Sequence, residues 1–255
     1  IYYPAGAPGL RFDKAGGAFI LTTWRGLFIM LRAVIFDFDG VIANTEHLHL
    51  GAFQKTLAGE GIGLTEEDYY ANYLAYDDKT LFSKLYQERG LELDDALLSA
   101  LMDRKSLHYD EMIGGNIELL PGSVDFIKAL AGKYRLAIGS GALEAEILRV
   151  LDFAGVRESF QVIVGADNIE NCKPEPDVYI EALRRLNALQ SGGPDISPAE
   201  CLVIEDSISG IRAALAAGMK CLAVTNSYSE AELSEAHAIK PGLEGLDIGT
   251  LGHLF

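Results

Sequence analysis

Acidic side chains follow two apolar stretches of the sequence, at the points where buried strands would end. Asp37 and Asp39 come directly after the β-branched run that begins at Ala33, and Glu205 and Asp206 follow a second such run. Asp37 and Asp39 are two positions apart, so on extended backbone both side chains lie on the same side. Close carboxylates repel each other unless a proton or cation lies between them, and oxygen ligands suit Mg²⁺. We therefore predict a Mg²⁺ site at Asp37, Asp39, Glu205 and Asp206. The alternative for each acid is a cap on the next helix or turn.

A hydroxyl and a lysine are expected near these acids. Ser140 lies between Gly139 and Gly141, after an expected strand and before a helix, where its hydroxyl and nearby backbone N–H groups can hold a phosphate. Lys173 precedes a proline, and beside acids and a phosphate it would neutralise substrate charge and steady Asp37. The alternatives are a simple N-cap for the serine and a solvated loop lysine. Ligands bind at the carboxyl ends of strands in an open parallel sheet, so these groups should converge there.

The side chains named above must be positioned by strands and helices. One strand is expected before residue 46, and strands and helices alternate after residue 114. Strands are expected at 33–36, 134–138, 160–164, 201–204 and 220–224, and helices at 123–130, 142–151, 177–189 and 207–217. Strands separated by helices indicate a parallel sheet covered on both faces. The fold class predicted is therefore α/β, with a doubly wound, Rossmann-like core.

The stretch 46–113 has a different pattern. Apolar residues recur there at helical spacing and no strand is evident, which predicts a helical insert of about 70 residues. The core would then consist of residues 30–45 and 114–255. Residues 1–29 are expected to be an N-terminal extension, either a hairpin around Gly16-Gly17 or a segment upstream of a natural start at Met30.

Length and composition limit the classes of function. The chain has 255 residues, 49% of them hydrophobic, which suffices to bury a core. The net charge of −16 disfavours nucleic-acid binding, which depends on neutralising phosphates. A phosphorylated small molecule can still bind where a metal or a few cations gather.

The setting expected is cytoplasmic. Three cysteines without CxxC spacing do not suggest a disulfide framework and fit a reducing compartment. The apolar stretch 18–36 is interrupted by Arg25 and Arg32 and is too short to span a membrane, which needs ~20 apolar residues. The expected partner is a small phosphorylated metabolite, with neither nucleic acid nor membrane, and the expected state is a monomer or weak homodimer.

Four short motifs occur in order along the chain. They are Asp37-Phe38-Asp39-Gly40-Val41, Ser140, Lys173-Pro174-Glu175-Pro176, and Glu205-Asp206-Ser207 with Gly210. Any one of them is weak, but the ordered set is specific and resembles the haloacid dehalogenase superfamily of phosphohydrolases. The helical insert directly after the first motif resembles the cap domain of the subfamily that includes phosphoglycolate phosphatase-like enzymes and β-phosphoglucomutase.

The resemblance implies a role for each matched residue. Asp37 would be the nucleophile and form an aspartyl-phosphate, and Asp39 would be the general acid and then the general base. The Ser140 hydroxyl and the Gly141 amide would bind the transferring phosphoryl oxygens, and Lys173 would offset negative charge.

The metal is also implied by the resemblance. Asp206 would ligate Mg²⁺ together with Asp37 and the backbone carbonyl of Asp39, while Glu205 would hold the water molecules of the metal. The true haloacid dehalogenases lack the second aspartate of the first motif, so the presence of Asp39 argues against dehalogenation.

The entry to the expected cap carries a further group of residues. His49 is expected to steady Asp39, the alternative being a partly buried helical histidine. The segment Tyr73–Phe82 is expected to face the site and help select the substrate. Substrate binding is predicted for Gly40, Thr45, Glu46, His49, Ser140, Gly141 and Lys173.

The function predicted is a Mg²⁺-dependent phosphatase acting on a small phosphate monoester, such as a sugar phosphate. The first alternative is a phosphosugar mutase like β-phosphoglucomutase, and the second is a non-catalytic protein that binds a phosphometabolite. The chain has no P-loop, GxSxG or HExxH motif, so a P-loop nucleotidase, an esterase triad and a zinc peptidase are unsupported.

Overall fold

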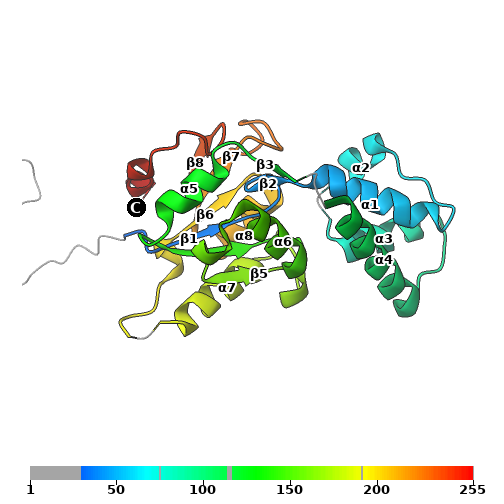
Figure 1. Cartoon of the computed structure of the whole chain (residues 1–255), viewed down its shortest axis with the longest axis horizontal. Coiled ribbons are helices and arrows are strands. Elements are labelled where there is room, and N and C mark those ends of the chain that lie inside the picture. The colour runs from blue at the N-terminus through cyan, green and yellow to red at the C-terminus, as the bar shows by residue number, and fades with distance from the viewer. Residues whose placement is uncertain (1–29, 75, 114–116, 191, 255) are drawn as a thin grey trace, which may run out of the picture.

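Figure 1 shows a computed structural model of the protein, which describes residues 30–74, 76–113, 117–190 and 192–254. The hairpin or extension predicted for residues 1–29 lies outside the described residues. Among the described helices, none combines the length and the apolar character that crossing a bilayer would require.

A six-stranded parallel sheet forms the centre of the core, in the order β5-β4-β1-β6-β7-β8. Its strands are β1 (Ala33–Phe36), β4 (Arg135–Gly139), β5 (Val162–Val164), β6 (Cys201–Glu205), β7 (Lys220–Val224) and β8 (Ala238–Lys240). From β1 the chain builds outward through β4 and β5, then crosses back to β6 on the other side of β1. The loops after β1 and β6 therefore diverge, and such a switch point is where α/β sheets bind ligands.

Helices cover both faces of the sheet, as the predicted fold class requires. In β1, Val34 and Phe36 point into one apolar cluster, whereas Ala33 and Ile35 point into the other. The first cluster is completed by α5 (Ser123–Leu130), α6 (Glu144–Ala154) and the 3₁₀ helix Ile248–Leu254. The second is completed by α7 (Asp177–Ala188) and α8 (Ile208–Ala216).

Four helices form a separate unit beside the sheet (Figure 1). They are α1 (Glu46–Ala58), α2 (Glu66–Asn72), α3 (Asp78–Glu88) and α4 (Asp95–Ile113), and they are called the helical unit below. The unit has its own apolar cluster, in which Phe53, Phe82 and Leu101 are buried. A short antiparallel pair, β2 (Ala43–Asn44) and β3 (Glu118–Leu119), carries the chain out of the core and back into it.

The start of α5 depends on a glycine. The N-cap is Gly122, at φ +78°, and a side chain there would collide with the backbone of Glu244. Ser123 is the first helical residue, and its hydroxyl donates 3.0 Å to the carbonyl of Ile42. The serine therefore joins α5 to the loop before β2.

Candidate active site

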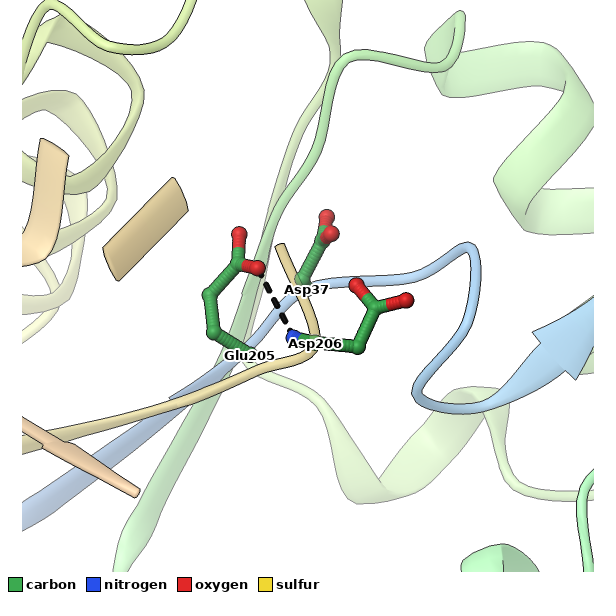
Figure 2. Close-up of side chains that lie close together, drawn as sticks. All are labelled: Asp37, Glu205 and Asp206. Carbon is green, nitrogen blue, oxygen red and sulfur yellow. Dashed lines mark hydrogen bonds between the residues drawn. The ribbon is translucent and has the colours of Figure 1, made fainter. Parts of the chain in front are cut away.

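The first and fourth motifs, which carry the acids of the sheet edge, meet at the switch point of the sheet. The backbone N–H of Asp37, just after β1, donates 2.9 Å to the carbonyl of Ile204 in β6. Asp37 thus lies beside Glu205 and Asp206, which end that strand. Figure 2 shows the three carboxylates together, with those of Asp37 and Asp206 on neighbouring sides of one space.

Lys173 connects two of these acids. Its Nζ lies 2.8 Å from Oδ1 of Asp37 and 2.8 Å from Oε1 of Glu205. Burial raises the pKa of Asp37 to about 6, although the ammonium of Lys173 opposes this rise. The site therefore holds too little positive charge to ionise Asp37 as readily as an aspartate in water.

Glu205 is fully buried, and both of its oxygens are occupied. Oε1 accepts from Lys173 and from the hydroxyl of Tyr179 at 2.8 Å, while Oε2 accepts from the backbone N–H groups of Asp206 and Ser207 and from the Ser207 hydroxyl. Burial opposes its ionisation, but Lys173 and these hydrogen bonds outweigh burial and lower its pKa. Glu205 is thus an ionised support for its neighbours (the dashed line in Figure 2 marks its bond to Asp206).

The three acids can accommodate a cation. One carboxylate oxygen from each of Asp37, Glu205 and Asp206 lies within 4.8 Å of the others. Burial raises the pKa of Asp206 well above its usual value, and the charges of Glu205 and Asp37 add to this rise. A divalent cation would relieve this repulsion, and oxygen ligands favour Mg²⁺.

Asp39 lies toward the helical unit, away from the cluster. It accepts a short hydrogen bond from the Thr45 hydroxyl, and its Oδ2 is 3.9 Å from Nε2 of His49. Burial, followed by the charges of Glu46 and Asp37, raises the pKa of Asp39 well above its usual value. The raised pKa favours the protonated form of Asp39, which can donate a proton.

His49 is oriented by a buried lysine. Lys105 donates 2.7 Å to Nδ1 of His49, and it also lies 3.0 Å from Asp78 and 3.4 Å from Glu146. Burial, together with the nearby charge of Lys105, lowers the pKa of His49 well below its usual value. This shift favours the neutral imidazole. Because Nδ1 accepts from the Lys105 ammonium, a neutral ring carries its proton on Nε2, the nitrogen that faces Asp39.

The expected phosphate site is a tight turn after β4. The N–H of Ser140 donates 3.0 Å to Val164 in β5, and the N–H of Ala142 donates 3.1 Å to the Ser140 hydroxyl oxygen. Gly141, between them, has open space where a side chain would lie. A ligand can therefore approach its backbone closely.

A cavity of about 420 Å³ separates the sheet edge from the helical unit. Nine of the predicted site residues line it: Asp37, Asp39, Gly40, Glu46, His49, Ser140, Gly141, Lys173 and Asp206. Thr45, predicted to bind substrate, and Glu205, predicted to hold the waters of a metal, do not belong to its lining. Both are fully buried, and each contacts a lining acid.

Several lining residues were not predicted. Asn226, Ser227 and Tyr228 follow β7, and the rule that ligands bind at strand ends, applied to this strand too, would have found them. Asn226 donates 2.6 Å to the carbonyl of Gly40, and Ser227 donates to Asp206.

The helical unit adds an aromatic wall. Tyr69 and Tyr70 line the cavity without any signal in the sequence, because their α2 helix reads as an ordinary amphipathic segment. Part of the predicted segment 73–82 lines it as well, through Leu74, Tyr76, Asp77 and Asp78.

The sequence of the chain matches the model of a protein family that carries the same motifs. The family model of the haloacid dehalogenase-like hydrolases matches residues 34–224, which include every acid, the serine and the lysine described above. The chain belongs to this family. The match confirms the resemblance drawn from the four motifs, and the class of reaction is hydrolysis of a phosphoric monoester.

Individual proteins are similar to most of the chain. Protein CbbY of Rhodobacter capsulatus is 32% identical over 79% of this chain and 88% of that protein. Fructose-1-phosphate phosphatase YqaB of Escherichia coli is 31% identical over 75% of this chain and 95% of that protein. A crystal structure of a CbbY mutant from Rhodobacter sphaeroides, in complex with xylulose-(1,5)bisphosphate, has a TM-score of 0.74 at 27% identity and covers 85% of this chain and 96% of that one.

Proposed function

We propose that this hydrolase removes the phosphate from a small phosphate monoester, such as a sugar phosphate, through a covalent intermediate on Asp37. The observation that carries the proposal is the position of Asp37. Its carboxylate lies 2.8 Å from Lys173, lines the cavity, and shares that cavity with Asp39 and Ser140. A carboxylate nucleophile divides a difficult hydrolysis into two easier steps.

In the first step, an oxygen of Asp37 attacks the phosphorus while the bond from phosphorus to the ester oxygen breaks. Asp39 gives its proton to that leaving oxygen, so the alcohol departs neutral. The Ser140 hydroxyl, the Gly141 amide and Lys173 stabilise the negative charge on the transferring oxygens, which is where phosphoryl transfer needs most help.

In the second step, water attacks the same phosphorus and Asp39 accepts a proton from it. The bond between phosphorus and Asp37 breaks, inorganic phosphate leaves, and Asp37 regains its carboxylate. Thr45 donates a hydrogen bond to Asp39 and His49 lies 3.9 Å from it, so both are proposed to orient this acid and base.

The residues present fit Mg²⁺, which Asp37, Asp206 and the backbone carbonyl of Asp39 would hold, with Glu205 behind them. When bound, the ion supplies positive charge that lets an anionic phosphate approach a carboxylate nucleophile.

The helical unit is proposed to act as a cap that excludes bulk water from the cavity.

The test is phosphate release from a panel of sugar phosphates with Mg²⁺ present, for the wild type and for Asp37→Asn. The wild type should release phosphate from at least one of them. Asp37→Asn should lower kcat by a factor on the order of 10³ or more, as for other lost nucleophiles, while its circular dichroism spectrum stays unchanged.

Two results would contradict this proposal. Turnover retained in Asp37→Asn would remove the nucleophile assignment. Isomerised sugar phosphate without free phosphate, followed by NMR, would instead indicate a mutase, in which the phosphoryl group returns to the sugar.

A further inference from the structure

We infer that the substrate carries a single phosphate and that its remaining part is uncharged and hydroxylated, because the wall provided by the helical unit rejects a second anion. This inference rests on the proposed phosphatase function and concerns the same cavity. It comes from the charges of the groups that line the side of the cavity opposite the sheet.

That wall contains aromatic and acidic side chains. Glu46, Asp77 and Asp78 are its acids, and its apolar and aromatic members are Phe53, Tyr69, Tyr70, Leu74 and Tyr76. Among the described residues that line this cavity, the one lysine or arginine is Lys173, which comes from the core. A second phosphate at this wall would therefore meet carboxylates and no cation.

Lys173 cannot serve both ends of a bisphosphate. Its ammonium already lies 2.8 Å from Asp37 and 2.8 Å from Glu205, at the end of the cavity where the reacting phosphate is proposed to bind. His49 also lines the cavity, but its two ring nitrogens already face other groups: Nδ1 lies 2.7 Å from Lys105 and Nε2 lies 3.9 Å from Asp39.

The lysines of the helical unit near this wall are engaged or turned elsewhere. Lys105 is fully buried and bonded to Asp78, Glu146 and His49. Lys84 donates 2.8 Å to the hydroxyl of Tyr76 and lies 4.0 Å from Glu88. Lys79 lines an adjoining cavity instead of this one.

The same wall suits hydroxyl groups. Glu46 accepts a hydrogen bond from the Tyr69 hydroxyl, which leaves its other oxygen available to accept from a ligand. Carboxylates accept from sugar hydroxyls, and tyrosine rings pack against the C–H faces of a sugar. A second phosphate or a carboxylate at this wall is repelled by its acids.

The test compares fructose 1-phosphate with fructose 1,6-bisphosphate, which present the same reacting phosphate and differ in charge at the other end. Free phosphate release at low ionic strength should give a kcat/KM at least about tenfold higher for the monophosphate, since like charges a few ångströms apart in a partly buried site repel strongly. Glyceraldehyde 3-phosphate and 3-phosphoglycerate form a second pair, in which the carboxylate should be disfavoured in the same direction.

An added cation should reverse this preference. Tyr70 lines the wall and is 43% exposed, so Tyr70→Arg should fold normally, which circular dichroism can verify. It should raise the ratio of kcat/KM for the bisphosphate over the monophosphate by about tenfold, whereas Tyr70→Gln, which changes size and polarity without charge, should leave the ratio near that of the wild type.

The outcomes separate the inference about substrate charge from the proposed phosphatase function. A wild type that hydrolyses both members of each pair within about threefold, or a ratio unchanged by Tyr70→Arg, would overturn the inference and leave the phosphatase proposal standing. If no monophosphate or bisphosphate in the panel is hydrolysed, the proposed function fails, and this inference fails with it.

Discussion

At the carboxyl end of β1, the acids of the site depend on small residues that leave room for them. Gly40 follows Asp39 with φ +73°, and a side chain at this position would collide with the Asp206 carboxylate. Asn226 also holds the Gly40 carbonyl from the opposite loop. The position of Asp206 therefore depends on a residue that does no chemistry itself.

Gly40→Ala should inactivate the protein by displacing Asp206. The left-handed backbone should add a stability cost of about 1–2 kcal/mol. Gly132→Ala is the matched control, because Gly132 has φ +78° and nothing within 4 Å of the added carbon. Urea denaturation should show similar losses of stability in the two variants. Assays of phosphate release should show that activity is lost in Gly40→Ala alone. Full activity in Gly40→Ala would contradict the packing argument.

At the scale of elements, strands with long buried runs were predictable and short connecting strands were not. Ala33–Phe36 and Cys201–Glu205 are buried at every position and have the β-branched composition of central parallel strands. β2 and β3 contain two residues each, too few for any periodicity to show. β8 is a half-exposed edge strand of three residues, Ala238–Lys240, and no apolar run marks it.

The candidate site was also predictable in part, where its residues follow long buried strands. Motif residues at the ends of β1, β4 and β6 could be placed because strand ends converge on one edge of a parallel sheet. Thr45 and Glu205 are fully buried behind the acids that line the cavity. Which side of the cavity wall a residue lies on depends on packing that sequence does not record. The contact of Lys105 with Glu146 joins two helices that are 41 positions apart in the chain, beyond the reach of any local pattern.

That contact is one link between the helical unit and the core, beside the packing of Leu48, Ala52, Tyr109 and Ile113 in the core cluster. Lys105 of α4 is fully buried, lies between Asp78 of α3 and Glu146 of α6, and contacts the rings of Phe53 and Tyr109. Removing one member of a buried ionic cluster leaves uncompensated charge, which costs about 3–5 kcal/mol.

Lys105→Met should therefore lower the free energy of unfolding by about 3 kcal/mol or more at neutral pH. Burial raises the pKa of Glu146 above its unfolded value of 4.5, and Lys105 opposes that rise. Without Lys105 the folded-state pKa rises further, so above pH 4.5 the folded chain retains a proton that the unfolded chain has released. The stability of the variant should accordingly fall relative to wild type as pH increases from 4.5 toward neutrality.

Lys84→Met is the control for this comparison, since Lys84 is a lysine of the same helical unit whose side chain is 35% exposed and whose ion pair with Glu88 is long, at 4.0 Å. Its substitution should change the free energy of unfolding by no more than about 0.5 kcal/mol. Urea denaturation of both variants across this pH range would check the expectation, and equal losses in the two would refute the buried ionic cluster as a source of stability.

For the whole molecule, charge balance links folding to metal binding. The chain carries a net charge of −16, and three buried acids meet at one edge of its sheet. A cation that binds the folded chain and not the unfolded chain stabilises the folded state in proportion to the logarithm of its concentration.

Millimolar Mg²⁺ should therefore raise the melting temperature by several degrees, because saturation at 100 times the Kd contributes about 2.7 kcal/mol. Asp206→Asn should remove most of this shift. Excess EDTA should abolish phosphate release, and added Mg²⁺ should restore it. A full rate in excess EDTA would rule out the role assigned to the ion.

The short pairing of Ala43 with Leu119 has a consequence for how such a protein can change over evolution. The polypeptide leaves the sheet layer and returns to it through two adjacent strands, so the ends of the helical unit are neighbours. We propose that residues 46–113 act as a module. Its replacement would leave the strand order of the sheet in place and would exchange Glu46 and His49, which line the cavity. New specificities can arise by exchanging or lengthening this module, while the machinery beneath it is inherited unchanged.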